Sequence, residues 1–216
     1  MGVTALGWRD FADGPPEAQD ALTTAIEVGG AVARERSERV ALIATAIGGR
    51  LGLTDALIGR VAVAGRLRDV GMTAVPEAIL SKQGPLTSVE MAEVKRHPEL
   101  GEELLADAGL GEIAKWVRHH HERWDGTGYP DNLCGPEIPI ESRILAIADA
   151  LAAMTAERPY RSAMGAGMAS LEIKASAGTQ FDPGIARIVI ALLERDAFAG
   201  DSDADSDHNL TQAVDA

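Results

Sequence analysis

Apolar residues recur three or four positions apart through most of the sequence, and this spacing limits the chain to helical structure. In residues 38–51 they fall at helical intervals, at Val40, Leu42, Ile43, Ala46, Ile47 and Leu51. No stretch alternates convincingly between apolar and polar residues, which is the pattern of a half-buried strand. The sequence therefore predicts an all-α domain.

Turn and capping residues divide the helical pattern into segments. Gly52 ends one segment, and Thr54 or Asp55 is suited to cap the next. Thr87 and Glu90 have the spacing of a capping box. The predicted helices cover residues 17–28, 38–51, 55–69, a segment from 87 that includes 97, then 111–121, 141–155, 164–177 and 183–195. Residues 125–139, rich in Gly, Pro and Asn, are predicted to form a long loop.

The ends of the chain differ from its middle in composition. Residues 1–16 are rich in Gly, Pro and Asp and are predicted to form a flexible arm. Residues 196–216 are rich in Asp, Ala and Ser, and we expect a disordered acidic tail there. Residues 17–195 remain as one helical domain, long enough to enclose a hydrophobic core.

Composition also limits the location and the partners. No apolar run approaches the roughly 20 residues of a membrane helix, and no export signal is recognisable. A lone cysteine, Cys134, excludes an internal disulfide and fits a cytoplasmic location. The net charge of −13 argues against nucleic-acid binding through bulk electrostatics. A small anionic ligand would need a local cluster of basic groups.

Histidines form the first candidate site. Three follow one another at 119–121, and His97 lies upstream. Successive residues of a helix point about 100° apart, so at most two of the three can face one site. An adjacent pair with nearby carboxylates is typical of a metal site. The alternative is a solvated helix end, where the helix dipole favours imidazoles.

Two carboxylates, Asp69 and Asp149, lie in otherwise apolar helices. A carboxylate among such neighbours is costly unless a cation compensates it. That cation is either a metal held by histidines or an arginine of the chain, with Arg36 and Arg68 available. In the second case the two Arg–Asp pairs have purely structural value.

Two further motifs are suited to contact a ligand. The segment DGTGYP at 125–130 has glycines that let backbone amides approach a ligand, and it ends in Tyr129 and Pro130. Arg158 and Arg161 place two guanidiniums close together, and each can donate paired hydrogen bonds to phosphate oxygens. Either motif alone is a weak signal.

Together these segments resemble one known family. The string HHERWDGTGYP at 120–130 is similar to the signature of HD-GYP domains, and matches continue with IAD at 147–149, RPYR at 158–161 and GTQFDP at 178–183. The resemblance implies an HD-domain-like bundle of about seven or eight helices with a GYP loop. It also implies cyclic di-GMP phosphodiesterase activity in bacterial signalling, with two or three metal ions, usually iron or manganese.

The resemblance assigns roles residue by residue. One metal would be bound by four residues that are all present: Asp69, His97, His120 and His121. The other would share Asp69 and take Asp149, with two histidines at the positions of Arg36 and Arg68. Asp69 and His121 would be catalytic, and the substrate would contact Tyr129, Arg158 and Arg161.

The two arginines are the main departure from the family. Arginine stays protonated and has no lone pair for a metal. Met72 stands where the family has a phosphate-binding lysine, and Val32 where it has an acidic ligand of a third metal. We therefore expect a guanidinium of Arg36 or Arg68 to occupy the empty metal position, pairing with Asp69 and Asp149.

The resulting functional hypothesis is a domain with one divalent ion, iron or manganese, or with none. It would bind cyclic di-GMP, a related nucleotide, or a signalling protein through the GYP loop, with weak or no hydrolysis. One alternative is an active phosphodiesterase that uses the remaining metal centre. Another is a purely structural interaction domain. A homodimer is left open.

Overall fold

Helices make up the fold, and the computed structural model of the chain describes residues 8–13, 16–28, 30–156 and 163–204. Within those ranges no strand forms, and there are only two isolated bridges. The elements, with η for a 3-10 helix, are η1 (Trp8–Phe11), α1 (Pro16–Val28), α2 (Gly30–Arg50), α3 (Asp55–Leu67), η2 (Val70–Ala74), α4 (Glu77–Leu80), α5 (Ser88–Val94), α6 (His97–Asp107), α7 (Gly111–Arg118), η3 (Gly135–Glu137), α8 (Ile140–Met154), α9 (Ala166–Ser176) and α10 (Pro183–Ala204). None of the helices in the described part of the chain has both the length and the apolar character of a membrane span.

The predicted capping residues are confirmed. Thr54 caps α3, and its hydroxyl accepts the backbone N–H of Leu57. Thr87 and Glu90 form a complete capping box at the start of α5. Gly52 has a φ of 73° just after α2, a conformation that glycine adopts without a steric penalty. The all-α prediction is thus confirmed, although short helices such as the one-turn α4 make ten α-helices among the described residues.

The two predicted helices that carry histidines differ from the structure. The helix expected from 87 through 97 is divided in two, because α5 ends at Val94 and α6 begins at His97. Pro98 lies in the first turn of α6, where its missing N–H costs no hydrogen bond. The helix expected over 111–121 ends at Arg118, so the histidine run does not lie on a helix. Imidazoles at 119 and 120 bind the carbonyls of residues 115 and 117, and such side-chain bonds compete with helix continuation.

The two ends also differ from the expected boundaries. Helix α10 continues through Ala204, nine residues past the predicted end at Arg195, and residues 205–216 of the predicted tail lie outside the described residues. Of the predicted N-terminal arm, residues 8–13 contain η1, and Phe11 packs against the core. Residues 1–7 and 14–15 lie outside the described part.

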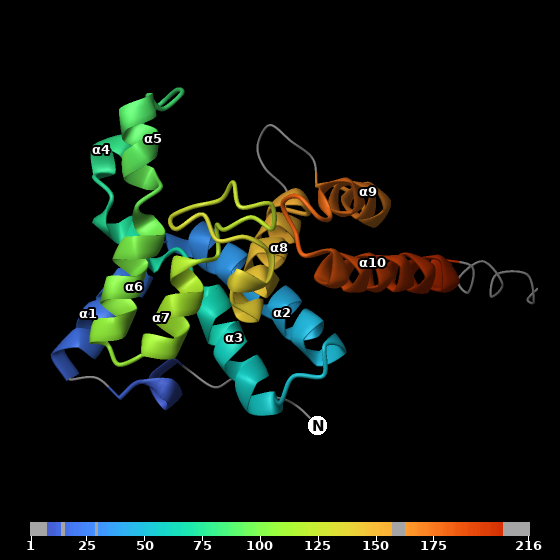
Figure 1. Cartoon of the computed structure of the whole chain (residues 1–216), viewed down its shortest axis with the longest axis horizontal. Coiled ribbons are helices and arrows are strands. Elements are labelled where there is room, and N and C mark those ends of the chain that lie inside the picture. The colour runs from blue at the N-terminus through green and yellow to red at the C-terminus, as the bar shows by residue number, and fades with distance from the viewer. Residues whose placement is uncertain (1–7, 14–15, 29, 157–162, 205–216) are drawn as a thin grey trace, which may run out of the picture.

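Helix α2 is the centre of the packing (Figure 1), since it packs against both α3 and α8. Helix α6 packs against α7 and η2, while α9 and α10 pair at the other side of the molecule. Side chains that face the common core are fully or almost fully buried, among them Val40, Ile47, Val61, Leu105, Val117, Ile144, Ile147, Ile173 and Val189. Leu42, from the same apolar set in the sequence, instead faces solvent.

A close backbone contact joins η2 to α6. A Cβ at Gly71 would collide with the carbonyl oxygen of His97 and approach the backbone of Gly101. Glycine at 71 therefore lets the turn after α3 lie directly on the first turn of α6. This contact brings Asp69 to His97, so the packing of the fold places two candidate ligands together.

The variant Gly71→Ala is expected to destabilise the domain by about 2–3 kcal/mol, because the new methyl group cannot fit without moving the backbone of α6. Gly49→Ala is the matched control. A Cβ at that helical position meets nothing within 4 Å, and we expect stabilisation by about 0.5–1 kcal/mol. Urea denaturation of both variants measures the difference, and equal midpoints would contradict the close contact.

Candidate metal centre

Three imidazoles meet at the end of α7. His97 begins α6, and His120 and His121 follow α7 in a turn. Ring centroids lie 5.4 Å apart for the pair 97 and 120, 5.0 Å for 97 and 121, and 4.0 Å for 120 and 121. One nitrogen from each ring lies within 4.8 Å of the other two. Because the run lies in a turn rather than on a helix, adjacent imidazoles can face one point.

Hydrogen bonds set the tautomers of two of these rings. The Nδ1 atoms of His97 and His120 lie 2.9 Å and 2.6 Å from the carbonyl oxygens of Val94 and Val117. A carbonyl only accepts, so each Nδ1 carries the proton and each Nε2 keeps its lone pair. Both Nε2 atoms are buried and have no hydrogen-bond partner in the described part of the chain. Buried, unpaired lone pairs on converging imidazoles fit a divalent metal ion.

The surroundings keep two imidazoles neutral. Burial lowers the pKa of His120 to about 3, and nearby His97 contributes to the shift. Burial likewise lowers the pKa of His121 to about 2, with His120 and His97 adding to the effect. Only a neutral imidazole can bind a metal, so both rings are in the ligating form at neutral pH.

Acid is expected to destabilise the metal-free domain. The unfolded chain protonates these two histidines near pH 6.5, whereas the folded state does so only near pH 3 or below. Between these values the unfolded state binds more protons, so the free energy of unfolding falls as the pH falls. Each histidine lowers the free energy of unfolding by about 1.4 kcal/mol for each pH unit in this range. Well above pH 6.5 both are neutral in either state, and the free energy of unfolding no longer depends on them.

Urea denaturation of the chelator-treated domain between pH 7.5 and 5 measures this slope. The variant His120→Asn removes one of the two titrating groups and should lose about half of the slope. A free energy of unfolding that stays constant down to pH 5 would contradict the burial of neutral imidazoles.

Asp69 joins the histidines at one corner. Its Oδ1 lies 3.6 Å from Nε2 of His97. Contrary to the prediction, Asp69 does not lie within a helix but between α3 and η2, because α3 ends at Leu67. Of the predicted four-residue set, His97, His120 and His121 converge on one point, and Asp69 lies beside this cluster at His97. Whether these four side chains bind a metal remains a prediction.

The second carboxylate, Asp149 on α8, is bound by both arginines. Nη2 of Arg36 lies 3.0 Å from each Asp149 oxygen, and Nε of Arg68 donates to Oδ1 at 2.7 Å. Nη2 of Arg68 also lies 2.7 Å from Oδ2 of Asp69, an ion pair although the N–H is not aimed for a hydrogen bond. The predicted pairing of guanidiniums with the two aspartates is confirmed, with both arginines taking part.

The two arginines differ in burial. Arg68 is completely buried, and its Nη1 donates to Ser37 Oγ at 3.2 Å and to the carbonyl of Gly65 at 3.1 Å. The Arg36 side chain is 40% exposed. Arg68 is thus a permanent part of the interior, whereas Arg36 reaches the site from its solvent side.

The loop after the histidines covers the cluster. The ring of Tyr129 stacks on His121 with centroids 4.9 Å apart and planes 24° apart, and Lys95 lies over the tyrosine ring at 5.1 Å. Burial, with Asp69 and Asp149 nearby, raises the pKa of Tyr129 to about 12, so the phenol keeps its proton.

Glu122, which sequence reasoning did not single out, anchors this loop. Its side chain is buried, and Oε1 accepts the backbone N–H of Asp131 at 2.7 Å. Gly128 packs so closely on residues 122 and 123 that a Cβ would collide with their backbone. The histidine pair and the loop are therefore joined through one buried carboxylate.

Other predicted positions fall outside the cluster. His119 bonds to Asp131 at 3.0 Å on the surface and does not belong to the histidine group. Met72 is half-buried in η2. Arg158 and Arg161 lie outside the described residues, as does the side chain of Val32.

The sequence matches the family model of the HD domain over residues 22–185, which is most of the chain. The chain belongs to the HD-domain family. Over 159 residues it is 41% identical to the "Cyclic di-GMP phosphodiesterase response regulator RpfG" of Xanthomonas campestris pv. campestris, covering 72% of this chain and 41% of that protein. Over 176 residues it is 36% identical to "3'3'-cGAMP-specific phosphodiesterase 2" of Vibrio cholerae, covering 80% of this chain and 33% of that protein. The chain thus spans between a third and a half of the length of these relatives.

A solved structure supports the same fold. The structure superposes on Bd1817, an HDG"Y"P protein from Bdellovibrio bacteriovorus, with a TM-score of 0.60 at 16% identity. The match covers 75% of this chain and 52% of that one. The predicted resemblance to HD-GYP domains is confirmed.

Proposed function

We propose that this HD domain binds a cyclic dinucleotide at a centre with one metal ion, and that it hydrolyses this ligand weakly or not at all. The observation that supports this proposal is the double ion pair of Asp149 with Arg36 and Arg68. A second metal at Asp149 would have to displace or face two guanidiniums, one of them fully buried. The positive charges of a metal ion and two guanidiniums, all in contact with one carboxylate, would repel one another strongly in a protein interior.

The remaining residues fit a single divalent ion. His97, His120 and His121 would each offer a neutral imidazole nitrogen, and Asp69 would complete the set with a carboxylate oxygen. Nitrogen and oxygen donors of this kind suit iron or manganese. When bound, such an ion supplies a Lewis acid that polarises a phosphoryl oxygen. The chain itself positions the ligands, because the Nδ1–H bonds of His97 and His120 to backbone carbonyls fix the orientation of these two rings.

Loss of the second metal accounts for the weak hydrolysis. In a two-metal site one ion stabilises the attacking oxygen and the other the leaving oxygen. A guanidinium carries positive charge but accepts no lone pair, so it compensates Asp149 without activating a nucleophile. Several kcal/mol of transition-state stabilisation would be lost with the second ion.

The ligand class follows from the relatives and from the site. The two relatives are named for cyclic di-GMP and for 3'3'-cGAMP, and both ligands carry two phosphodiester groups. Tyr129 presents an aromatic wall beside the cluster, and Arg36 presents a partly exposed guanidinium. These groups are suited to a ring and to a phosphate.

The exposure of Arg36 also favours a second candidate, an active phosphodiesterase. Because its side chain is 40% exposed, its guanidinium can approach a bound phosphate and replace part of the lost metal charge. A protein partner at the loop and a homodimer remain predictions.

The test measures binding and hydrolysis separately. The purified domain is loaded with Mn²⁺, or with Fe²⁺ under anaerobic conditions, and mixed with cyclic di-GMP or 3'3'-cGAMP. Calorimetry reports binding, and chromatography reports linear product. We expect binding with little product, and loss of metal in His121→Ala but not in His119→Ala, the neighbouring histidine outside the cluster.

Each outcome decides between the candidates. Rapid turnover that depends on His121 would establish the phosphodiesterase instead. No binding of either nucleotide with metal present would reject both functions.

A further inference from the structure

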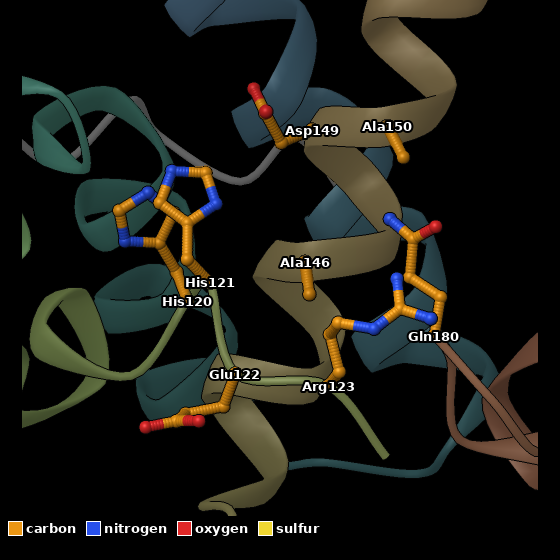
Figure 2. A pocket seen from close by; sticks show the side chains of 8 residues that line it. All are labelled: His120, His121, Glu122, Arg123, Ala146, Asp149, Ala150 and Gln180. Atoms are coloured by element: carbon orange, nitrogen blue, oxygen red, sulfur yellow. The ribbon is translucent and has the colours of Figure 1, made fainter. Parts of the chain in front are cut away.

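A small pocket lies beside the metal cluster, against one face of α8 (Figure 2). His121 and Asp149 stand at one end of it, Arg123 and Gln180 at the other, and Ala146 and Ala150 of α8 lie between. Its volume is about 180 Å³. That is the space of about six water molecules, which suits one ring system and not a whole dinucleotide.

Arg123 is held in place and neutralised at the pocket rim. Its Nε and Nη2 donate to the two oxygens of Asp125 at 3.3 Å and 3.1 Å, and Nε also donates to Thr127 at 2.9 Å. One edge of the guanidinium is therefore used, and Nη1 has no bond among the described residues. Nη1 and the second N–H of Nη2 are therefore left to donate hydrogen bonds to a ligand.

Gln180 supplies the complementary group. Its backbone is fixed, since its carbonyl accepts the N–H of Trp124 at 3.2 Å and its N–H donates to Ser176 at 3.0 Å. Its side-chain amide makes no hydrogen bond within the described ranges, which leaves one acceptor and two donors for a ligand. The rim thus offers donors and an acceptor without net charge.

The alanines explain the shape of the pocket. At 146 and 150 the methyl groups form an apolar part of the pocket wall on α8. A planar ring can lie on such a surface while its edge meets the polar rim.

We infer that this pocket receives a guanine base of the bound cyclic dinucleotide, an inference that rests on the proposed function. Guanine presents two adjacent acceptors, O6 and N7, which match two N–H groups of a guanidinium. The free end of Arg123, Nη1 with the second N–H of Nη2, is placed to supply them. The amide of Gln180 pairs with the remaining polar edge, and the base lies beside the metal that holds the phosphate.

Filling the pocket tests this inference. In Ala146→Leu we expect affinity for cyclic di-GMP to fall at least tenfold, with metal content unchanged. Gln180→Ala should lose about threefold to tenfold, the effect of one or two neutral hydrogen bonds. Ala175→Leu, at an exposed alanine of α9, is the control and should bind as the unmodified domain does. Unchanged affinity in Ala146→Leu would overturn the inference.

A second measurement separates this inference from the proposed function. The metal-loaded domain is titrated with 5′-GMP and with 5′-AMP while the alanine methyl signals are followed by NMR. We expect 5′-GMP to shift the methyls of Ala146 and Ala150 more than 5′-AMP does. No shift with 5′-GMP overturns the pocket assignment even if cyclic di-GMP binds. A shift with 5′-GMP but no binding of cyclic di-GMP supports the pocket and rejects the proposed function.

Discussion

Histidine at both Arg36 and Arg68 is expected to raise the metal content of the domain from one ion to two per chain. The double variant removes the two guanidiniums from Asp149 and puts neutral imidazoles in their place. Asp149 and the shared Asp69 then face two nitrogen ligands, which is the set that the HD-GYP resemblance implies for the first metal. With a second ion present, hydrolysis of cyclic di-GMP should rise about a hundredfold, or about 2.7 kcal/mol in activation free energy.

Metal content by mass spectrometry and product formation by chromatography measure this result. Arg66→His is the matched control, because Arg66 lies at the end of α3, two residues before Arg68, but pairs with Glu38 at the surface, 2.8 Å away. The control should keep one ion per chain. Two ions in the unmodified domain would show that the arginines do not exclude the second metal.

Asp149→Ala is expected to lower the free energy of unfolding by about 3 kcal/mol, because it leaves a buried guanidinium without its main partner. Arg68 is fully enclosed and cannot turn to water. Its contact with Asp69 remains but is partly solvated, since that side chain is 38% exposed. The variant that removes both charges, Asp149→Ala with Arg68→Met, should be more stable than Asp149→Ala alone.

Urea denaturation of the two single variants and the double variant gives the coupling energy directly. The surface pair of Arg66 and Glu38 is the control, and Glu38→Ala should cost at most about 1 kcal/mol. If Asp149→Ala costs no more than Glu38→Ala, the buried ion pair does not stabilise the fold.

Local signals in the sequence were sufficient to predict the all-α fold and several helix boundaries. Caps and glycines act on the nearest residues, so Thr54, Thr87 and Gly52 marked boundaries that the structure reproduces. The sequence also predicted that Asp149 pairs with a cation, because it is a carboxylate in an otherwise apolar helix. Which arginine would supply it depended on packing, and the structure uses both.

The histidine run shows what local signals miss. Placed on a helix, three consecutive residues cannot converge, and the sequence pattern favoured a helix there. The imidazoles at 119 and 120 bind backbone carbonyls and the helix ends at Arg118, which frees the next two rings to face one point. The pocket could not be predicted from the sequence either, since Arg123, Ala146 and Gln180 are far apart in the chain and come together only in the tertiary fold.

The buried carboxylate of Glu122 has a consequence for how the site responds. It follows His121 directly in the chain and fixes the backbone of Asp131, two residues after Tyr129. The carboxylate therefore links the histidine pair to the loop. A ligand that displaced the loop would disturb the imidazoles through this link, and by reciprocity a metal bound to the imidazoles would change the affinity for that ligand by the same factor. In the proposed function, binding of the metal and binding of the nucleotide would therefore be coupled through this carboxylate.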